Sequence, residues 1–235
     1  MGVLMKKSRI RLGFVALVAS VVLVGGVATP SYADSGQISP DVLAFINTNF
    51  DELGVAQEVR AGLLKKYAAG ESFDNASGAQ PVSVESYRVD ITDYTREVFA
   101  DGSVTLTSLE RPTTPTKSSK GLTPYGIVGC SYKLSGGVAT WSNCKIEKNN
   151  IILTMWYHAG YWRYSGGGYG TSITNTWDWD IQTAGGACAF NYLGNPTSTK
   201  SRLRAYCTVV LGIGSSYPYL DLDITSSTVA VNANW

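Results

Sequence analysis

The chain has 235 residues, of which 19 are Lys or Arg and 18 are Asp or Glu, so its net charge is +1. A predicted leader carries four of the basic residues and no acidic one, which leaves the rest of the chain at −3. This balance argues against a nucleic-acid partner, because such proteins hold the phosphate backbone with an excess of basic residues.

The first 33 residues have the pattern of a secretory signal peptide. Basic residues at positions 6, 7, 9 and 11 precede an uncharged apolar run, Leu12–Val27, and Ser31 and Ala33 are small residues at the positions before a cleavage site. The apolar run is short for a membrane span. We therefore predict cleavage before Asp34 and a secreted, extracellular protein.

A short helical hairpin is predicted after the leader. Ser39, Pro40 and Asp41 have the pattern of a helix start, with a cap residue, a proline in the first turn and an acidic side chain. A second helix is predicted over Val55–Ala69, because apolar residues recur on one face and Gly70 follows the last of them.

A β-hairpin and a linker follow the helices. Two segments rich in β-forming residues, Tyr87–Phe99 and Ser103–Leu109, are separated by Ala100-Asp101-Gly102, which contains a favoured turn pair. The next segment is dominated by Pro, Thr, Ser and Lys and predicts an extended linker. The predicted segments are the signal peptide 1–33, the helical and hairpin region 34–110, the linker 111–126 and a β domain 127–235.

The predicted β domain alternates between apolar and polar residues. Apolar residues recur at every second position in 173–181, 202–213 and 217–224, which is typical of strands with one buried face. Residues 151–157 place apolar side chains on both faces, as in a central strand covered on both sides. The predicted fold class is mainly β: a disulfide-bonded antiparallel β-sandwich preceded by a short helical hairpin and a β-hairpin.

All four cysteines lie in the predicted β domain, and an even number of cysteines in a secreted chain predicts disulfides. The bridges that join neighbouring strands in a plausible register are Cys130–Cys144 and Cys188–Cys207, and we predict these two. A zinc site is not predicted, because no Cys-x-x-Cys pair is present.

Each predicted bridge fixes a strand register. The first bridge centres a turn on Gly136-Gly137 and places Leu134 opposite Thr140. The second bridge places Tyr192 opposite Leu203 on the buried face.

Four short motifs extend from the helical region to the first cysteine. They are Leu63–Glu71, Pro81–Ser83, Phe99–Val104 and Gly129-Cys130. On these motifs the chain resembles a group of small secreted proteins of actinobacteria over most of its length after the leader. The resemblance implies secretion and the order helices, hairpin, linker and β domain. It implies no chemistry, since that group has no established activity.

Few residues of the sequence are suited to catalysis. His158 is the only histidine, and no Gly-x-Ser-x-Gly motif is present. Ala159-Gly160 follows this histidine and is interpreted as a hairpin turn, so His158 is expected at the surface, at a strand end. We predict no catalytic residue, no cofactor and no metal.

Two Asp-x-Asp pairs are the sharpest candidates for chemistry. Asp178/Asp180 and Asp221/Asp223 each place two carboxylates on one strand face, pointing to solvent. The interpretation we favour is a ladder of ion pairs with the arginines at positions 202 and 204. Calcium ligands and the acid and base of a glycosidase remain as alternatives.

Aromatic residues are the remaining functional signal. Alternation assigns Trp177 and Trp179 to the core and leaves Trp156 and Trp162 undecided. Exposed rings stack on sugar faces while neighbouring Asp side chains supply hydrogen bonds. The candidate ligand-binding residues are therefore Tyr164, Tyr206, Tyr217, Tyr219, Asp178, Asp180, Asp221 and Asp223.

The leading hypothesis is a secreted, non-catalytic binding module that recognises an extracellular glycan or a cell-wall polymer. The first alternative is a membrane-active or toxin-like protein that inserts the Gly-rich aromatic segment Tyr161–Gly170. The second is a glycan hydrolase that uses the Asp pairs.

Overall fold

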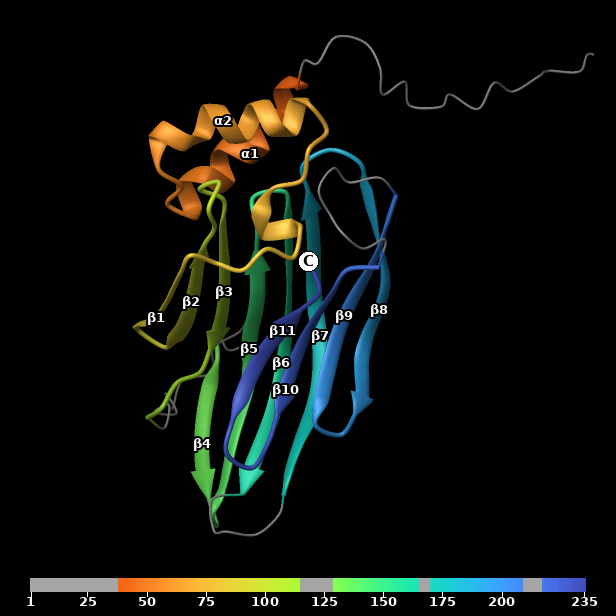
Figure 1. The fold of residues 1–235 in the computed structure, drawn as a ribbon. Coiled ribbons are helices and arrows are strands. Elements are labelled where there is room, and N and C mark those ends of the chain that lie inside the picture. The colour runs from red at the N-terminus through yellow and green to blue at the C-terminus, as the bar shows by residue number, and fades with distance from the viewer. Residues whose placement is uncertain (1–37, 115–128, 165–169, 209–216) are drawn as a thin grey trace, which may run out of the picture. The chain divides into compact units, whose positions relative to one another are not determined.

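The computed structural model of the chain describes residues 38–114, 129–164, 170–208 and 217–235 (Figure 1). All of these residues fall within one unit, residues 36–235. The predicted signal peptide and most of the predicted linker lie outside the described residues. In the described ranges, no helix is long and apolar enough to cross a membrane.

Two helices, α1 (Pro40–Glu52) and α2 (Gln57–Ala68), confirm the predicted helical hairpin. Pro40 lies in the first turn of α1, where its missing N–H costs no helical hydrogen bond. Gly70 ends the second helix with a φ of 73°, the left-handed conformation that favours glycine. A short 3-10 helix, η1 (Asp74–Ala76), follows.

Three strands come next and form an antiparallel meander: β1 (Ser83–Val89), β2 (Thr92–Val98) and β3 (Val104–Glu110). The prediction of one long strand from Tyr87 to Phe99 is wrong. A turn at Asp90 and Ile91 divides this segment, and Asp90 adopts a φ of 51°. Asp tolerates this left-handed conformation better than most residues, so it permits a tight turn without glycine.

Two antiparallel sheets contain all the strands of the described residues. The later strands are β4 (Ser131–Ser135), β5 (Val138–Asn149), β6 (Leu153–Tyr164), β7 (Thr171–Thr183), β8 (Ala187–Thr197), β9 (Lys200–Thr208), β10 (Tyr219–Ile224) and β11 (Val229–Ala233). Sheet A has the order β1-β2-β3-β5-β6-β7, with β4 also paired to β5, and sheet B has the order β11-β10-β9-β8 (Figure 1). Because β3 pairs with β5, the hairpin region and the predicted β domain share one sheet.

The main core lies between the two sheets and confirms the predicted fold class, a mainly β protein with antiparallel sheets behind a short helical segment. Met155 and Tyr157 of sheet A pack with Leu203 and Leu222 of sheet B. The Tyr157 hydroxyl lies 2.9 Å from Ser201 Oγ, so its polar end has a partner across the sandwich. Burial raises the pKa of Tyr157, which keeps this hydroxyl neutral.

A second core joins the helices to one end of sheet A. Phe50 and Leu63 pack with Ile151 and Ile152, which lie between β5 and β6. The buried side-chain amide of Asn49 donates a hydrogen bond of 2.7 Å to the carbonyl of Ile151. The helices are therefore held to the sheet by both apolar packing and a buried polar contact.

Both predicted disulfides, Cys130–Cys144 and Cys188–Cys207, are present. Cys188 lies directly opposite Cys207 in the β8–β9 pair, as the register predicts. The loops that they close span 14 and 19 residues. Each bridge contributes about 2–4 kcal/mol by restricting the unfolded chain.

The finer register predictions around the bridges are wrong by one residue. Tyr192 lies opposite Arg204 instead of Leu203, because the β8–β9 register shifts between Phe190 and Tyr192. A β-bulge of this kind inserts one unpaired residue and moves every later side chain to the opposite face. As a result, Tyr192 lies on the outer face of sheet B.

The register at the first bridge differs for a similar reason. Leu134 lies opposite Ala139 instead of Thr140, because the predicted turn at Gly136-Gly137 is a tight two-residue turn. The difference of one residue is accommodated in β5, where the β5–β6 register shifts between Trp141 and Cys144.

The predicted turn at Ala159-Gly160 is wrong, since β6 runs through both residues as far as Tyr164. Gly160 is suited to its position for a different reason. A Cβ atom there would lie 2.5 Å from Asn175 Oδ1 and 2.6 Å from Thr174 Oγ1. Because these β7 side chains lie so close, position 160 of β6 requires a residue without a side chain. His158 therefore lies in the middle of a strand and not at its end.

Candidate functional site

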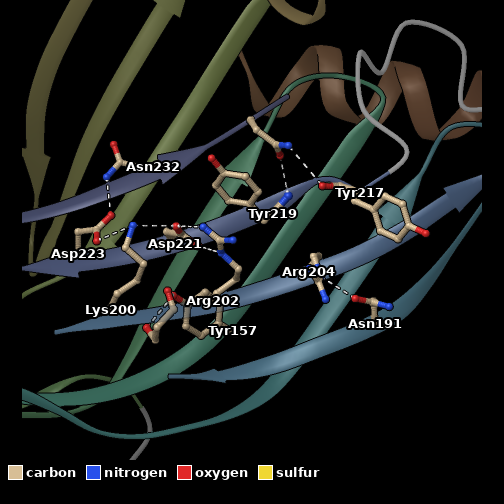
Figure 2. A network of polar contacts seen from close by, with 12 residues as sticks. Tyr157, Asn191, Lys200, Arg202, Arg204, Tyr217, Tyr219, Asp221, Asp223 and Asn232 are labelled. Atoms are coloured by element: carbon tan, nitrogen blue, oxygen red, sulfur yellow. Dashed lines mark hydrogen bonds and ion pairs between the residues drawn. The ribbon is translucent and has the colours of Figure 1, made fainter. Parts of the chain in front are cut away.

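The outer face of sheet B gathers most of the predicted site residues. On β9 and β10, Leu203 and Leu222 face the core, so the side chains that alternate with them point outward. The strand register places Tyr219 opposite Arg204, Asp221 opposite Arg202 and Asp223 opposite Lys200. We call this surface the tyrosine–arginine face; it comprises Asn191, Tyr192, Lys200, Arg202, Arg204, Tyr206, Tyr217, Tyr219, Asp221, Asp223 and Asn232. Figure 2 labels all of these residues except Tyr192 and Tyr206.

Arg202 is the centre of the polar network on this face. Its Nε atom donates a hydrogen bond to Asp221 Oδ1 and its Nη2 atom donates one to Asp221 Oδ2, both at 2.7 Å. Its guanidinium carbon lies 3.9 Å from the centroid of the Tyr219 ring, in a cation–π contact. The hydrogen bond to Asp221 raises the pKa of Arg202 against the opposing effect of burial. The guanidinium thus binds the carboxylate through two parallel hydrogen bonds, a geometry that a lysine cannot reproduce.

The position of Asp221 differs from the prediction. It lies on the outward side of β10, but its side chain is only 1% exposed. The reason is that Arg202 and Lys200 of the neighbouring strand fold over the carboxylate, with Lys200 Nζ 3.3 Å from Oδ2. The predicted ion pair with Arg202 is therefore present, but its carboxylate is buried and not solvent-exposed. The predicted pair with Arg204 is not formed among the described residues, because Arg204 lies opposite Tyr219 and bonds to Asn191.

Asp223 is tied into the same network from the other side. Lys200 Nζ lies 3.0 Å from its Oδ1, and Asn232 of β11 donates a hydrogen bond of 2.8 Å to its Oδ2 (Figure 2). The hydrogen bond to Asp223 raises the pKa of Lys200, against a smaller opposing effect of burial. Both carboxylates of this Asp pair are therefore engaged by cations or amides of neighbouring strands.

Two aromatic rings are exposed on this face. Tyr206 is 42% exposed and Tyr217 is 50% exposed, and their ring centroids lie 5.1 Å apart at an angle of 44°. Asn234 holds the chain here, since its side chain accepts from the Tyr219 amide at 2.7 Å and donates to the Tyr217 carbonyl at 3.3 Å. Two rings are thus presented to solvent on a rigid backbone.

Arg204 and Asn191 border these rings. Arg204 Nε donates a hydrogen bond of 2.6 Å to Asn191 Oδ1, and its guanidinium lies 6.0 Å from the ring centroid of Tyr192. The contact is exposed, and it uses one of the five N–H donors of the guanidinium. Polar groups able to bind hydroxyls therefore lie beside the aromatic pair.

The remaining predicted site residues lie on sheet A and not on this face. Asp178 is the extra residue of a β-bulge in β7, with a φ of 47° and a side chain that is 62% exposed. Its Oδ2 approaches His158 Nδ1 to 3.3 Å. Asp180 accepts hydrogen bonds from the Ile181 amide and from Gln182. Tyr164 is exposed at the end of β6.

The prediction that both tryptophans of β7 are buried in the core is wrong. Trp179 is 39% exposed and stacks on Phe190 of β8, with the two ring centroids 4.4 Å apart. Trp177 pairs in register with His158 on the outer side of sheet A and is half-buried. The bulge at Asp178 places these two residues, two apart in sequence, on opposite faces of the sheet.

Sequence reasoning missed an aromatic row on the outer side of sheet A. Trp156 and Trp177 flank His158, with ring centroids 5.5 Å and 6.2 Å from the imidazole. Lys145 lies 5.0 Å from the Trp156 ring. The signal was weak, because β6 has large side chains on both faces and shows no clear alternation.

No metal site accompanies these residues. Among the described residues, no group of three or more His, Cys, Asp or Glu side chains could hold a metal ion. Comparison with protein-family models, with curated proteins and with solved structures found no match in any of the three. The geometry of the outer faces is therefore the basis for any functional inference.

Proposed function

We propose that the protein is a secreted, non-catalytic binding module whose tyrosine–arginine face recognises a glycan or another cell-surface polymer. The observation that carries the proposal is the exposed ring pair Tyr206–Tyr217, held 5.1 Å apart beside Arg204 and Asn191. Aromatic rings bind the apolar faces of sugars, and planar amides and guanidinium groups bind their hydroxyls.

The charged network supports binding rather than catalysis. A general acid or base must place a carboxylate within hydrogen-bonding reach of a substrate. Asp221 is buried and has both oxygens engaged by Arg202, and Asp223 is shared between Lys200 and Asn232. These groups hold the strands and the Tyr219 ring in place, so they are suited to a rigid platform.

Two disulfides favour an oxidising, extracellular-like environment, since such bridges are rare in reducing compartments. Secretion is supported further by the leader pattern in residues 1–33 and by the resemblance to secreted actinobacterial proteins. A polymer of the cell wall or of the surrounding medium is the class of ligand that this location offers.

A sedimentation assay tests the proposal. The protein, with disulfides intact, is mixed with insoluble polysaccharides, peptidoglycan and whole cell walls, and the bound fraction is measured over a range of concentrations. We expect saturable binding to one class, weakened about tenfold by Tyr206→Ala and by Tyr217→Ala, because each removes an exposed ring from the face.

Tyr87→Ala is the matched control. Tyr87 is also an exposed tyrosine stacked on a second ring, at 5.3 Å from Tyr94, but it lies on β1 of sheet A. This variant is expected to bind like the wild type. Equal losses in all three variants, or no binding to any polymer, would contradict the proposal.

A further inference from the structure

A cleft of about 460 Å³ lies where sheet B ends above sheet A. One side is formed by β11, the last strand of sheet B, along its whole length, Val229–Ala233. The floor is formed by β2 and β3, with one residue, Lys148, contributed by β5. This volume is within the range of about 300–1,000 Å³ that is typical of ligand sites. The cleft is separate from the tyrosine–arginine face, since Asn232 is the only residue that the two share.

The hydrogen-bonding direction of β10 determines that of β11. The amide of Ile224 donates to the carbonyl of Thr199. The even-numbered residues of β10 therefore direct their backbone N–H and C=O groups toward β9. The odd-numbered residues Asp221 and Asp223 therefore point their backbone groups toward β11. In this register they bond to the residues opposite them on β11.

The other edge of β11 consequently faces away from β10 with unpaired backbone groups. Asn232 and Ala230 lie opposite Asp221 and Asp223 and use their N–H and C=O groups toward β10. Val229, Val231 and Ala233 direct theirs to the opposite side. No strand among the described residues pairs with that side. An exposed strand edge of this kind is a template for a further strand.

A cationic side chain in the floor has no hydrogen-bond partner among the described residues. Lys148 Nζ lies 5.5 Å from the centroid of the Trp235 ring, and no described residue accepts a hydrogen bond from it. Burial lowers the pKa of Lys148, and the charge of Glu97 opposes this effect. A partly buried ammonium that lacks an acceptor favours a ligand that brings one.

Most of the remaining floor residues are polar, and two of them lie in register with this lysine. Thr107 of β3 pairs with Lys148 on one side and with Thr95 of β2 on the other, and these three residues form a row across the sheet. Asp93, at the same cleft, is already neutralised by two arginines, at 2.8 Å each. Glu97 of β2 also lines the cleft, and its charge acts on Lys148 without a hydrogen bond between the two side chains among the described residues. Lys148 is therefore the cation of the cleft whose hydrogen-bond donors are left for a ligand.

We infer that this cleft binds an extended polypeptide segment, which joins sheet B as a strand beside β11 and places an Asp or Glu side chain on Lys148. A peptide backbone offers N–H and C=O groups at the spacing that Val229, Val231 and Ala233 require, which a glycan does not. A segment of about five to seven residues spans the five-residue edge. Its inward side chains meet the threonine row, so small and polar residues fit there.

The test is a selection of random heptapeptides displayed on phage, panned on the full chain with disulfides intact and counterselected on Val231→Pro. Proline removes the outward N–H of the central edge residue, and edge strands tolerate it. We expect enriched peptides that share one acidic position. They should bind Val231→Pro at least tenfold more weakly, and Lys148→Met about tenfold more weakly.

Hydrogen exchange of the wild-type protein locates the bound peptide without relying on a variant. The amides of Val229, Val231 and Ala233 are expected to become protected, while Tyr217→Ala, on the other face, binds the peptide unchanged. If no peptide is enriched, or if the enriched peptides leave these three amides unprotected, the inference is wrong. The outcome of this peptide experiment is independent of the sedimentation assay, because that assay depends on Tyr206 and Tyr217 of the other face.

Discussion

The outer faces of the two sheets each carry an Asp-x-Asp pair, and the two pairs have opposite environments. On sheet B, Asp221 is 1% exposed and is gripped by Arg202 and Lys200. On sheet A, Asp178 is 62% exposed and approaches His158. The same local pattern thus produces a buried ionic network on one sheet and a solvated carboxylate on the other.

The position of each strand in its sheet explains the difference. β10 is an inner strand, so cations from β9 and an amide from β11 reach its outward carboxylates from both sides. Among the described strands, β7 is the last of sheet A and has β6 as its one partner. A carboxylate on an edge strand has fewer cross-strand neighbours and keeps more of its hydration. The contrast shows that cross-strand neighbours, and not the Asp-x-Asp pattern, determine the role of each carboxylate.

Asp221→Asn is expected to have the largest effect. The amide preserves the shape of the side chain but leaves Arg202 and Lys200 without their common anion in a buried position, at a cost of about 2–4 kcal/mol. Urea unfolding followed by tryptophan fluorescence measures the change in the free energy of unfolding. A loss below about 0.5 kcal/mol would show that the network on sheet B is no more important than an ordinary surface pair.

The sequence was sufficient to predict the elements that depend on local pattern. Pro40 and Gly70 mark the ends of the helical hairpin, and alternation identifies the strands β9 and β10. Residues 209–213 of the predicted alternating segment lie outside the described residues. The disulfide pairing was accessible because each bridge joins neighbouring strands through a short loop. These features are set by residues close to one another in the chain.

The features that could not be predicted depend on contacts between distant segments. The bulges at Asp178 and before Tyr192 shift the register, and the local alternation of apolar and polar residues does not predict them. The sequence placed Tyr206, Tyr217 and Tyr219 outward but could not show that β11 lies beside β10. It therefore missed both the burial of Asp221 and the cleft that Lys148 faces.

Arg202→Lys tests the geometry of the network while keeping its charge. Lysine cannot make the two parallel hydrogen bonds to Asp221 or the flat contact with Tyr219, so we expect a loss of about 1–2 kcal/mol. Arg204→Lys is the matched control, because Arg204 makes one exposed hydrogen bond to Asn191. Equal effects in the two variants would mean that the bidentate pair adds nothing to stability.

Lys200 gives the sheet B network a dependence on alkaline pH. Its hydrogen bond to Asp223 raises its pKa above the ordinary lysine value of 10.5. The stabilisation from a raised lysine pKa is complete below that value and is lost as the pH rises through the folded-state pKa. Lys200→Met is expected to flatten the decline in stability above about pH 10, by less than about 1 kcal/mol for this partly exposed group.

Thermal unfolding between pH 8 and pH 11 measures this effect. Lys133→Met is the control, since Lys133 is exposed on β4 and makes no ion pair among the described residues. An alkaline decline that is the same in wild type and Lys200→Met would place the titrating group elsewhere.

Asp178→Asn is expected to have the smallest effect and completes the comparison. The carboxylate is solvated and its approach to His158 at 3.3 Å is the one ion pair recorded for it among the described residues, so we expect a change within about 0.5 kcal/mol. Asn also tolerates the φ of 47° at this bulge, which makes the substitution a test of charge alone. Asp178→Gly then separates charge from backbone strain: it should be at least as stable as Asp178→Asn, because glycine adopts the left-handed region without steric cost. A loss from Asp178→Asn as large as that from Asp221→Asn, measured by urea unfolding under the same conditions, would contradict the account in which strand position decides the role of each carboxylate.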